Sequence, residues 1–194
     1  MSLLEQAGRL LRLTRSHDIA RRYIVVNGFD GALAMLGLII GFLVSTPAEL
    51  SVIINVCLGA AIALGMSGVS SAYVSEVAER KRALGKLEAA MVTDFQDSAH
   101  GEAARRVPQL IALVNGAAPL VISLIILIPL WLASAGIQLP LSPLYASIII
   151  AGVLVFLPGV FLGRIADIPW LRSGIQTLLV AMVTAALIYL FTGS

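Results

Sequence analysis

Five long apolar stretches, separated by shorter polar connections, dominate the sequence. They cover residues 23–44, 50–73, 107–133, 143–165 and 170–191. A helix rises 1.5 Å per residue, so about twenty residues cross the ~30 Å hydrocarbon core of a membrane, and every stretch is long enough. The pattern therefore predicts an all-α fold with five transmembrane helices.

The composition agrees with this prediction. Of the 194 residues, 59% are hydrophobic and 12% are charged, whereas soluble domains carry about a quarter charged residues. The net charge of +2 is too small to indicate nucleic-acid binding. We expect a multi-pass integral membrane protein of the cell membrane, in contact with the lipid bilayer. Its one cysteine, Cys57, permits no intramolecular disulfide.

The thirteen Lys and Arg residues indicate the orientation of the spans. All of them lie before the first stretch, around the connection between the second and third, or around the connection between the fourth and fifth. None lies in the first or third connection or at the C-terminus. Because Lys and Arg collect on the cytosolic side of membrane proteins, we expect a cytosolic N-terminus and an outside C-terminus.

Four regions follow from the spans. Residues 1–22 mix leucine with arginine and predict an amphipathic cytosolic N-terminal helix, either on the membrane surface or packed on the protein's own cytosolic face. Residues 23–75 contain spans 1 and 2. Residues 76–106 form a cytosolic helical connection, and residues 107–194 contain spans 3–5.

Local signals refine the helix ends. Residues 46–49 read TPAE, a capping-box pattern that predicts a helix start with Pro47 as the first helical residue. No helix breaker follows Tyr73, so the second helix should continue into water, where Gly85 weakens it without ending it. The prolines of the third span predict a kinked or broken helix.

Asp30 is the one acidic residue inside any of the five stretches. A carboxylate there costs roughly 2.5–3.5 kcal/mol on membrane-insertion scales, so an intramembrane acid is by default a functional-site hypothesis. The alternative is a protonated Asp30 that hydrogen-bonds a neighbouring helix and serves only the structure.

Small and polar residues line one face of the first span and much of the second. In the first span they are spaced three and four residues apart and share a face: Asn27, Asp30, Ala34, Gly37 and Gly41. In the second span they are Asn55, Gly59, Met66, Gly68, Ser70 and Ser71. Small faces allow membrane helices to approach closely, so we expect the face containing Asp30 to point at a partner helix or a cavity and to be the contact of any dimer.

Residues 76–106 form the one sizeable polar stretch. Six acids are interspersed with Lys and Arg there: Glu76, Glu79, Glu88, Asp94, Asp97 and Glu102. About thirty residues are too few for an independent domain. Two interpretations stay open, a solvated helical connection or a loading site for cations at the mouth of a pathway.

The sequence contains no convincing enzymatic motif. Asp30-Gly31 matches the start of the Asp-Gly-x-x-Ala-Arg pattern of membrane phosphatidyltransferases, but the arginine and the downstream aspartates are missing. No serine–histidine or HExxH arrangement supports a hydrolase. We therefore expect a protein that is not an enzyme.

Several short motifs occur in an order and spacing shared with a known family. They are Gly28-Phe29-Asp30-Gly31 with Gly37 and Gly41, the run AIALGMSGVSSAYVSEVAE at residues 61–79, Asn115-Gly116 with Pro119, and the segments 161–164 and 173–177. In these motifs the sequence resembles the vacuolar iron transporter family, over nearly all of the five-span core.

The resemblance implies a homodimeric transporter that exports Fe²⁺, and often Mn²⁺, from the cytosol in exchange for protons, along a pathway between the two subunits. Asp30 and Met66 would bind the metal, because a carboxylate suits a divalent cation and a thioether favours a softer one such as Fe²⁺. We also place Asn27 and Tyr73 on the pathway. The metal is the transported substrate, and no cofactor is expected.

The sequence departs from the plant and fungal members in its cytosolic region. Those members extend the second span into a glutamate-rich metal-binding domain, whereas the connection here is short. Glu79 aligns with one of those glutamates, and Glu76 and Glu88 are acidic at neighbouring positions. These three glutamates complete the set of expected metal ligands.

Two rival functions stay open. In a non-transporting assembly or scaffold protein, Asp30 would pin two helices and Met66 would fill space between them, which is the commoner role of methionine. A transporter of an organic or anionic substrate is the other rival. The absence of Lys and Arg from the middle of every stretch counts against an anion.

Overall fold

A computed structural model describes residues 16–45, 47–92 and 98–192 of the chain. In these residues the chain forms five helices: α2 (Ser16–Val44), α3 (Leu50–Met91), α4 (Ala99–Ser134), α5 (Pro143–Ile165) and α6 (Trp170–Thr192). Each is long and apolar enough to cross a membrane. The predictions of an all-α fold and of five candidate spans are therefore confirmed, and the fold is that of a membrane protein.

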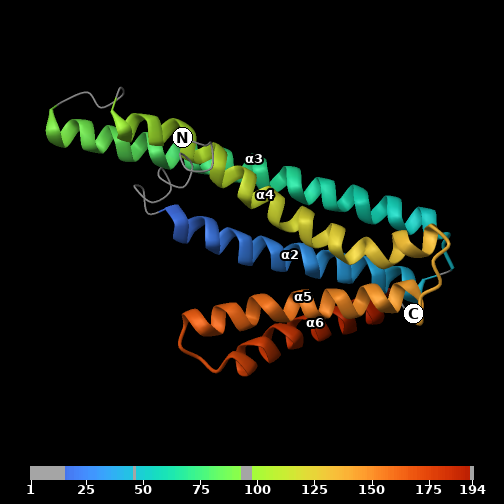
Figure 1. Ribbon diagram of the computed structural model, residues 1–194. Helices are drawn as coiled ribbons and strands as arrows, with labels where there is room; N and C mark the ends of the chain where they lie inside the picture. The colour runs from blue at the N-terminus through green and yellow to red at the C-terminus, as the bar shows by residue number, and fades with distance from the viewer. Residues whose placement is uncertain (1–15, 46, 93–97, 193–194) are drawn as a thin grey trace.

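The helices form two hairpins on either side of α2 (Figure 1). The hairpin of α3 and α4 packs along one side of α2, mainly through α4, and the hairpin of α5 and α6 packs along the other. α2 and α4 run in the same direction, and α3 runs against both. This arrangement makes α2 the one helix in contact with all four others.

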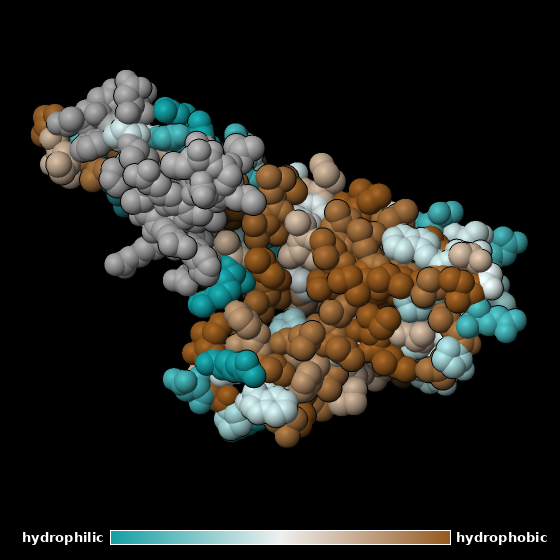
Figure 2. All heavy atoms as spheres, in the orientation of Figure 1, coloured by the Kyte–Doolittle hydropathy of each residue, from teal (hydrophilic) through white to brown (hydrophobic). Residues whose placement is uncertain are grey.

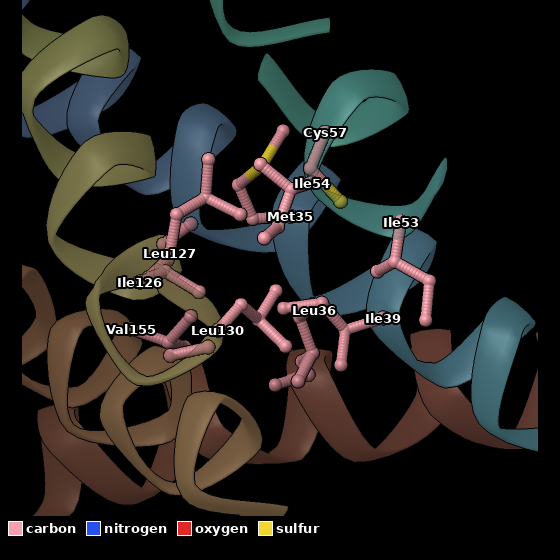
Figure 3. Packing of buried hydrophobic residues seen from close by; sticks show 13 residues of the cluster. Met35, Leu36, Ile39, Ile53, Ile54, Cys57, Ile126, Leu127, Leu130 and Val155 are labelled. Carbon is pink, nitrogen blue, oxygen red and sulfur yellow. The ribbon is translucent and has the colours of Figure 1, made fainter. Parts of the chain in front are cut away.

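The apolar core lies near the connection between α2 and α3. Figure 3 shows Met35 and Leu36 of α2 beside Cys57 of α3 and Leu127 of α4, and Val155 joins them from α5. All are fully or almost fully buried. Outside this core most large apolar side chains stay exposed, and they cover the middle of the face shown in Figure 2, with hydrophilic side chains at its two ends. An apolar outer surface of this extent is what a lipid environment requires.

α3 is far longer than a membrane span. Its 42 residues rise about 63 Å, twice the thickness of a hydrocarbon core. Figure 1 shows that the Met91 end of α3 and the beginning of α4 project together beyond the other three helices. The prediction that this helix continues past Tyr73 and through Gly85 is confirmed. Val92 ends it in a left-handed conformation (φ 52°), and its N–H donates to the Glu88 carbonyl.

One local prediction is wrong. α3 begins at Leu50, with Glu49 as its N-cap, so Pro47 is not its first helical residue. The Glu49 carbonyl accepts the N–H groups of Val52 and Ile53, and Pro47 and Ala48 are not helical. Of the two forms predicted for the third span, the broken helix is not found, because α4 is continuous through Pro108, Pro119 and Pro129. Neighbouring helices can compensate for the N–H that proline lacks inside a membrane bundle.

The N-terminal prediction lies largely outside the described residues. Residues 1–15 are not described, and residues 16–22 form the first turns of α2, continuous with the span itself. The fourth and fifth spans match α5 and α6 to within one residue.

Candidate functional site

Asp30 lies on an exposed side of α2, and in the described part of the chain no hydrogen bond or ion pair is found for it. Its neighbours explain the orientation. A Cβ on Gly31 would come within 2.7 Å of the Pro119 backbone, so only glycine fits where α2 meets α4 there. α2 therefore turns its glycine side to α4 and its carboxylate outward. The alternative in which Asp30 is bonded to a neighbouring helix finds no such bond among residues 16–45, 47–92 and 98–192.

Met66 and Tyr73 lie on exposed parts of α3, with exposed fractions of 60% and 44%. α3 buries a different stripe of residues, spaced four, seven and four apart: Ala61, Gly65, Ala72 and Glu76. Hydroxyl groups share the exposed side with Met66. Ser70 donates to the Met66 carbonyl at 2.8 Å and Ser71 to the Gly68 carbonyl at 3.4 Å. A polar strip thus runs along the outside of a membrane-spanning helix.

Asn27 is bonded into the bundle. Its Nδ2 donates to the Tyr23 carbonyl at 3.1 Å and to Oδ1 of Asn115 on α4. Asn115 is 4% exposed, and its Nδ2 donates to the Gly68 carbonyl of α3 at 2.7 Å. One chain of hydrogen bonds therefore joins α2, α4 and α3. We call Asn27, Asn115 and the Gly68 carbonyl the asparagine relay.

Glycines bring the helices of the relay close enough to bond. A Cβ on Gly116 would collide with the Val69 side chain and with the Gly65 carbonyl oxygen. A Cβ on Gly68 would meet the Gly116 Cα at 3.0 Å. The backbones of α3 and α4 thus nearly touch beside Asn115, which is how a short amide side chain reaches a carbonyl of the next helix.

The hydrogen bonds of Asn115 were not predicted from the sequence, where this residue contributed to the family resemblance. The signal was present, because Val26-Asn27-Gly28 and Val114-Asn115-Gly116 repeat the same three residues. In the structure the two repeats lie on helices that run in the same direction, and their asparagines bond to each other.

The three glutamates of α3 have different surroundings. Glu76 is buried, and its Oε2 lies 3.4 Å from Nη2 of Arg80. Glu79 is exposed and Glu88 is half-buried. Glu88 lies twelve residues after Glu76, about 18 Å along the helix. Over residues 16–45, 47–92 and 98–192, no three His, Cys, Asp or Glu side chains come together as a metal site.

The side chains of the predicted site residues therefore face different surroundings. Asp30, Met66 and Tyr73 face outward from the chain, Asn27 faces α4, and Glu76 faces Arg80. Asp30 and Met66 are thus both accessible from outside the chain.

Comparison with known proteins gives one clear relative. The chain is 30% identical over 180 residues to "Uncharacterized protein MJ0645" of Methanocaldococcus jannaschii, and the match covers 91% of each chain. No family model matches the chain. No solved structure matches it. The relative's name states no function, so an argument about function must start from the residues themselves.

Proposed function

We propose that this chain, which belongs to the same family as the uncharacterized protein MJ0645 of Methanocaldococcus jannaschii, is a secondary transporter of a divalent transition metal. In this proposal Fe²⁺ or Mn²⁺ leaves the cytosol in exchange for protons. The protein acts as a homodimer in the cell membrane, as its resemblance to the vacuolar iron transporters implies.

The observation that carries the proposal is the outward-facing carboxylate of Asp30 in the first span. A charged group in a membrane is costly, so natural spans keep such groups where they pair, reach water or bind an ion. Asp30 has no polar partner within the described part of its own chain. A cation in a pathway beside α2 would supply the missing partner.

The surrounding chemistry favours a cation of intermediate softness. No Lys or Arg lies in residues 23–73, so nothing there would neutralise an anion. Asp30 offers hard oxygen ligands and Met66 offers a soft thioether, a combination that suits Fe²⁺ better than Mg²⁺ or Ca²⁺. Asp30 can also exchange its metal for a proton, which would couple the two fluxes.

A second copy of the chain is the surface that would enclose this site. The hydroxyls and the carboxylate on the outer sides of α3 and α2 are poorly suited to lipid, and polar groups in membranes pack between helices. Pairing these sides across a dimer would place Asp30 and Met66 along a shared pathway. The exposed Glu79, on the projecting part of α3, would lie at its cytosolic mouth.

Metal uptake into proteoliposomes tests the proposal. The parent and Asp30→Asn should be compared for Fe²⁺, Mn²⁺ and Zn²⁺, with and without a pH gradient. Asn keeps the shape of the side chain but cannot balance the charge of a dehydrated cation, so we expect flux to be lost while dimer content in size exclusion is retained.

Asp167→Asn is the matched control. It makes the same chemical change in the turn between α5 and α6, where φ is 54°, a conformation that Asn adopts readily. This variant should transport like the parent. Normal flux in a well-folded Asp30→Asn protein would contradict the transport function and favour a scaffold protein.

A further inference from the structure

The asparagine relay lies at nearly the same level in the bundle as the two proposed metal ligands. Asp30 follows Asn27 by three residues, about 4.5 Å along α2 toward its connection with α3. Met66 precedes Gly68 by two residues, about 3 Å toward the same end, because α3 runs in the opposite direction. Each ligand is thus within about one helical turn of an atom held by Asn115.

The hydrogen bonds of the relay depend on the donors and acceptors of its two amide side chains. Both N–H groups of the Asn27 amide are used, one on the Tyr23 carbonyl and one on Asn115. Asn115 accepts from α2 through Oδ1 and donates to α3 through Nδ2. The amide is neutral and carries an acceptor and a donor on one short planar group. An apolar side chain of similar size can make neither bond.

We propose that Asn115 is a positioning residue that fixes the height of Met66 on α3 relative to Asp30 on α2. The inference rests on the proposed function for its consequence in transport, but the geometry can be tested without any flux. Asn115 touches neither ligand. It acts through the Gly68 carbonyl on one side and through Asn27 on the other, and the contacts around Gly116 keep α3 within reach of it.

The first measurement is the distance between spin labels on α2 and α3. Exposed positions Val26 and Val74 carry the labels in a Cys57→Ala background, diluted with unlabelled chain so that only distances within one chain are recorded. A second pair, Val74 with Leu113, reports on α3 and α4. Asn115→Leu, which removes both bonds, should shift or broaden the first distribution. Asn27→Leu, which removes only the bond from α2, should change the first pair and leave the second as in the parent.

The second measurement is metal preference at equal amounts of folded protein. Loss of residues that orient metal ligands costs about 10–100-fold in affinity or activity. We therefore expect the KM for Fe²⁺ to rise by about tenfold in Asn115→Leu and Asn27→Leu, with a changed ratio of Fe²⁺ to Zn²⁺ uptake. A purely structural role would lower the yield of folded protein but leave KM and the uptake ratio unchanged.

Ser123→Ala is the control on the same helix. Ser123 is fully buried on α4, and its hydroxyl has no hydrogen-bond partner in the described residues, so its removal should change neither distance nor transport. Parent-like distances in a folded Asn27→Leu or Asn115→Leu protein would overturn the inference. Parent-like KM values in these two variants would also overturn the inference, provided that Asp30→Asn is inactive. A parent protein without metal flux would overturn the proposed function instead, and the distances would then decide the role of Asn115 in holding the helices.

Discussion

Two acidic side chains show that the surroundings of a carboxylate decide whether it is paired within its own chain. Asp30 and Glu76 both sit on long, largely apolar helices. Glu76 is buried and pairs with Arg80 one turn later on the same helix. Asp30 faces outward without a partner within the described part of its chain. Glu76 thus has a charge partner in its own chain, whereas Asp30 is the carboxylate for which the proposed transport function would supply one.

Met66 provides a prediction at the same scale. Met66→Leu keeps the apolar volume but removes the thioether, so preference should move from Fe²⁺ toward the harder Mn²⁺ without abolishing transport. Competitive uptake of the two ions into proteoliposomes measures the ratio. Met182→Leu on α6, at a methionine of similar exposure (57%), should leave the ratio unchanged. An unchanged ratio in Met66→Leu would show that Met66 does not contact the metal.

At the scale of the helices, the crossing of α3 and α4 depends on backbones that nearly touch. Glycine at 65, 68 and 116 removes the side chains that would otherwise separate them. The projecting part of α3 has no such requirement, since a Cβ on Gly85 would meet nothing within 4 Å. The same residue type is therefore a packing requirement in one half of α3 and a weakness in the other.

This contrast predicts opposite effects of the same substitution. Gly116→Ala should destabilise the protein by about 1–3 kcal/mol, the usual cost of overpacking, because the added methyl collides with α3. Gly85→Ala should stabilise it by about 0.5–1 kcal/mol, because alanine is the better helix former. Unfolding in detergent, followed by circular dichroism, measures both. A Gly116→Ala protein as stable as the parent would mean that the α3–α4 contact is looser than described.

At the scale of the whole molecule, the basic residues and the projecting ends of α3 and α4 indicate the same orientation of the protein in the membrane. Lys81, Arg82 and Lys86 lie on α3 beyond the predicted end of its span at Tyr73, and Arg105 and Arg106 lie near the beginning of α4. Positive charge next to a membrane favours the cytosolic side. The projecting hairpin and the start of α2 would then both lie in the cytosol.

Cysteine labelling tests this orientation in the Cys57→Ala background. Gln138→Cys, in the exposed turn between α4 and α5, should react with an impermeant reagent in intact cells. Lys86→Cys, on the exposed projecting part of α3, should react only after the membrane is opened. The reverse pattern would invert the topology and with it the direction of metal export.

The dimer is the other prediction about the whole molecule. The face expected to pair, from Asp30 to Gly41, is partly used inside the chain, since Gly37 faces Ile188 of α6. The outer side of α3 remains uncovered. Ser70→Cys should therefore crosslink between subunits, whereas Leu157→Cys, equally apolar in surroundings but on the exposed side of α5, should not. Efficient crosslinking from Leu157 alone would place the interface on the opposite hairpin.

The sequence by itself determined the spans and their ends. Each span must match the thickness and the apolarity of the bilayer with its own residues, and it must pair its backbone groups through its own hydrogen bonds. The information that specifies a span is therefore local in the sequence. The five stretches match the five helices, the start of α3 was misplaced, and α4 is continuous where a kink or a break was expected. Asp30 was also visible from the sequence, because an acid in an apolar stretch is conspicuous without any knowledge of its neighbours.

Only the tertiary structure decided which polar groups meet. Asn27 and Asn115 are 88 residues apart, and Asn115 and the Gly68 carbonyl are 47 apart. Periodicity shows that a residue shares a face with others on its own helix, but not which helix that face meets. That choice depends on how closely the backbones fit at Gly31, Gly65 and Gly116, which is a property of paired surfaces. For this reason the sequence groups Asn27 with Asp30 on one face of the first span, and only the structure shows that the Asn27 amide bonds Asn115 of α4.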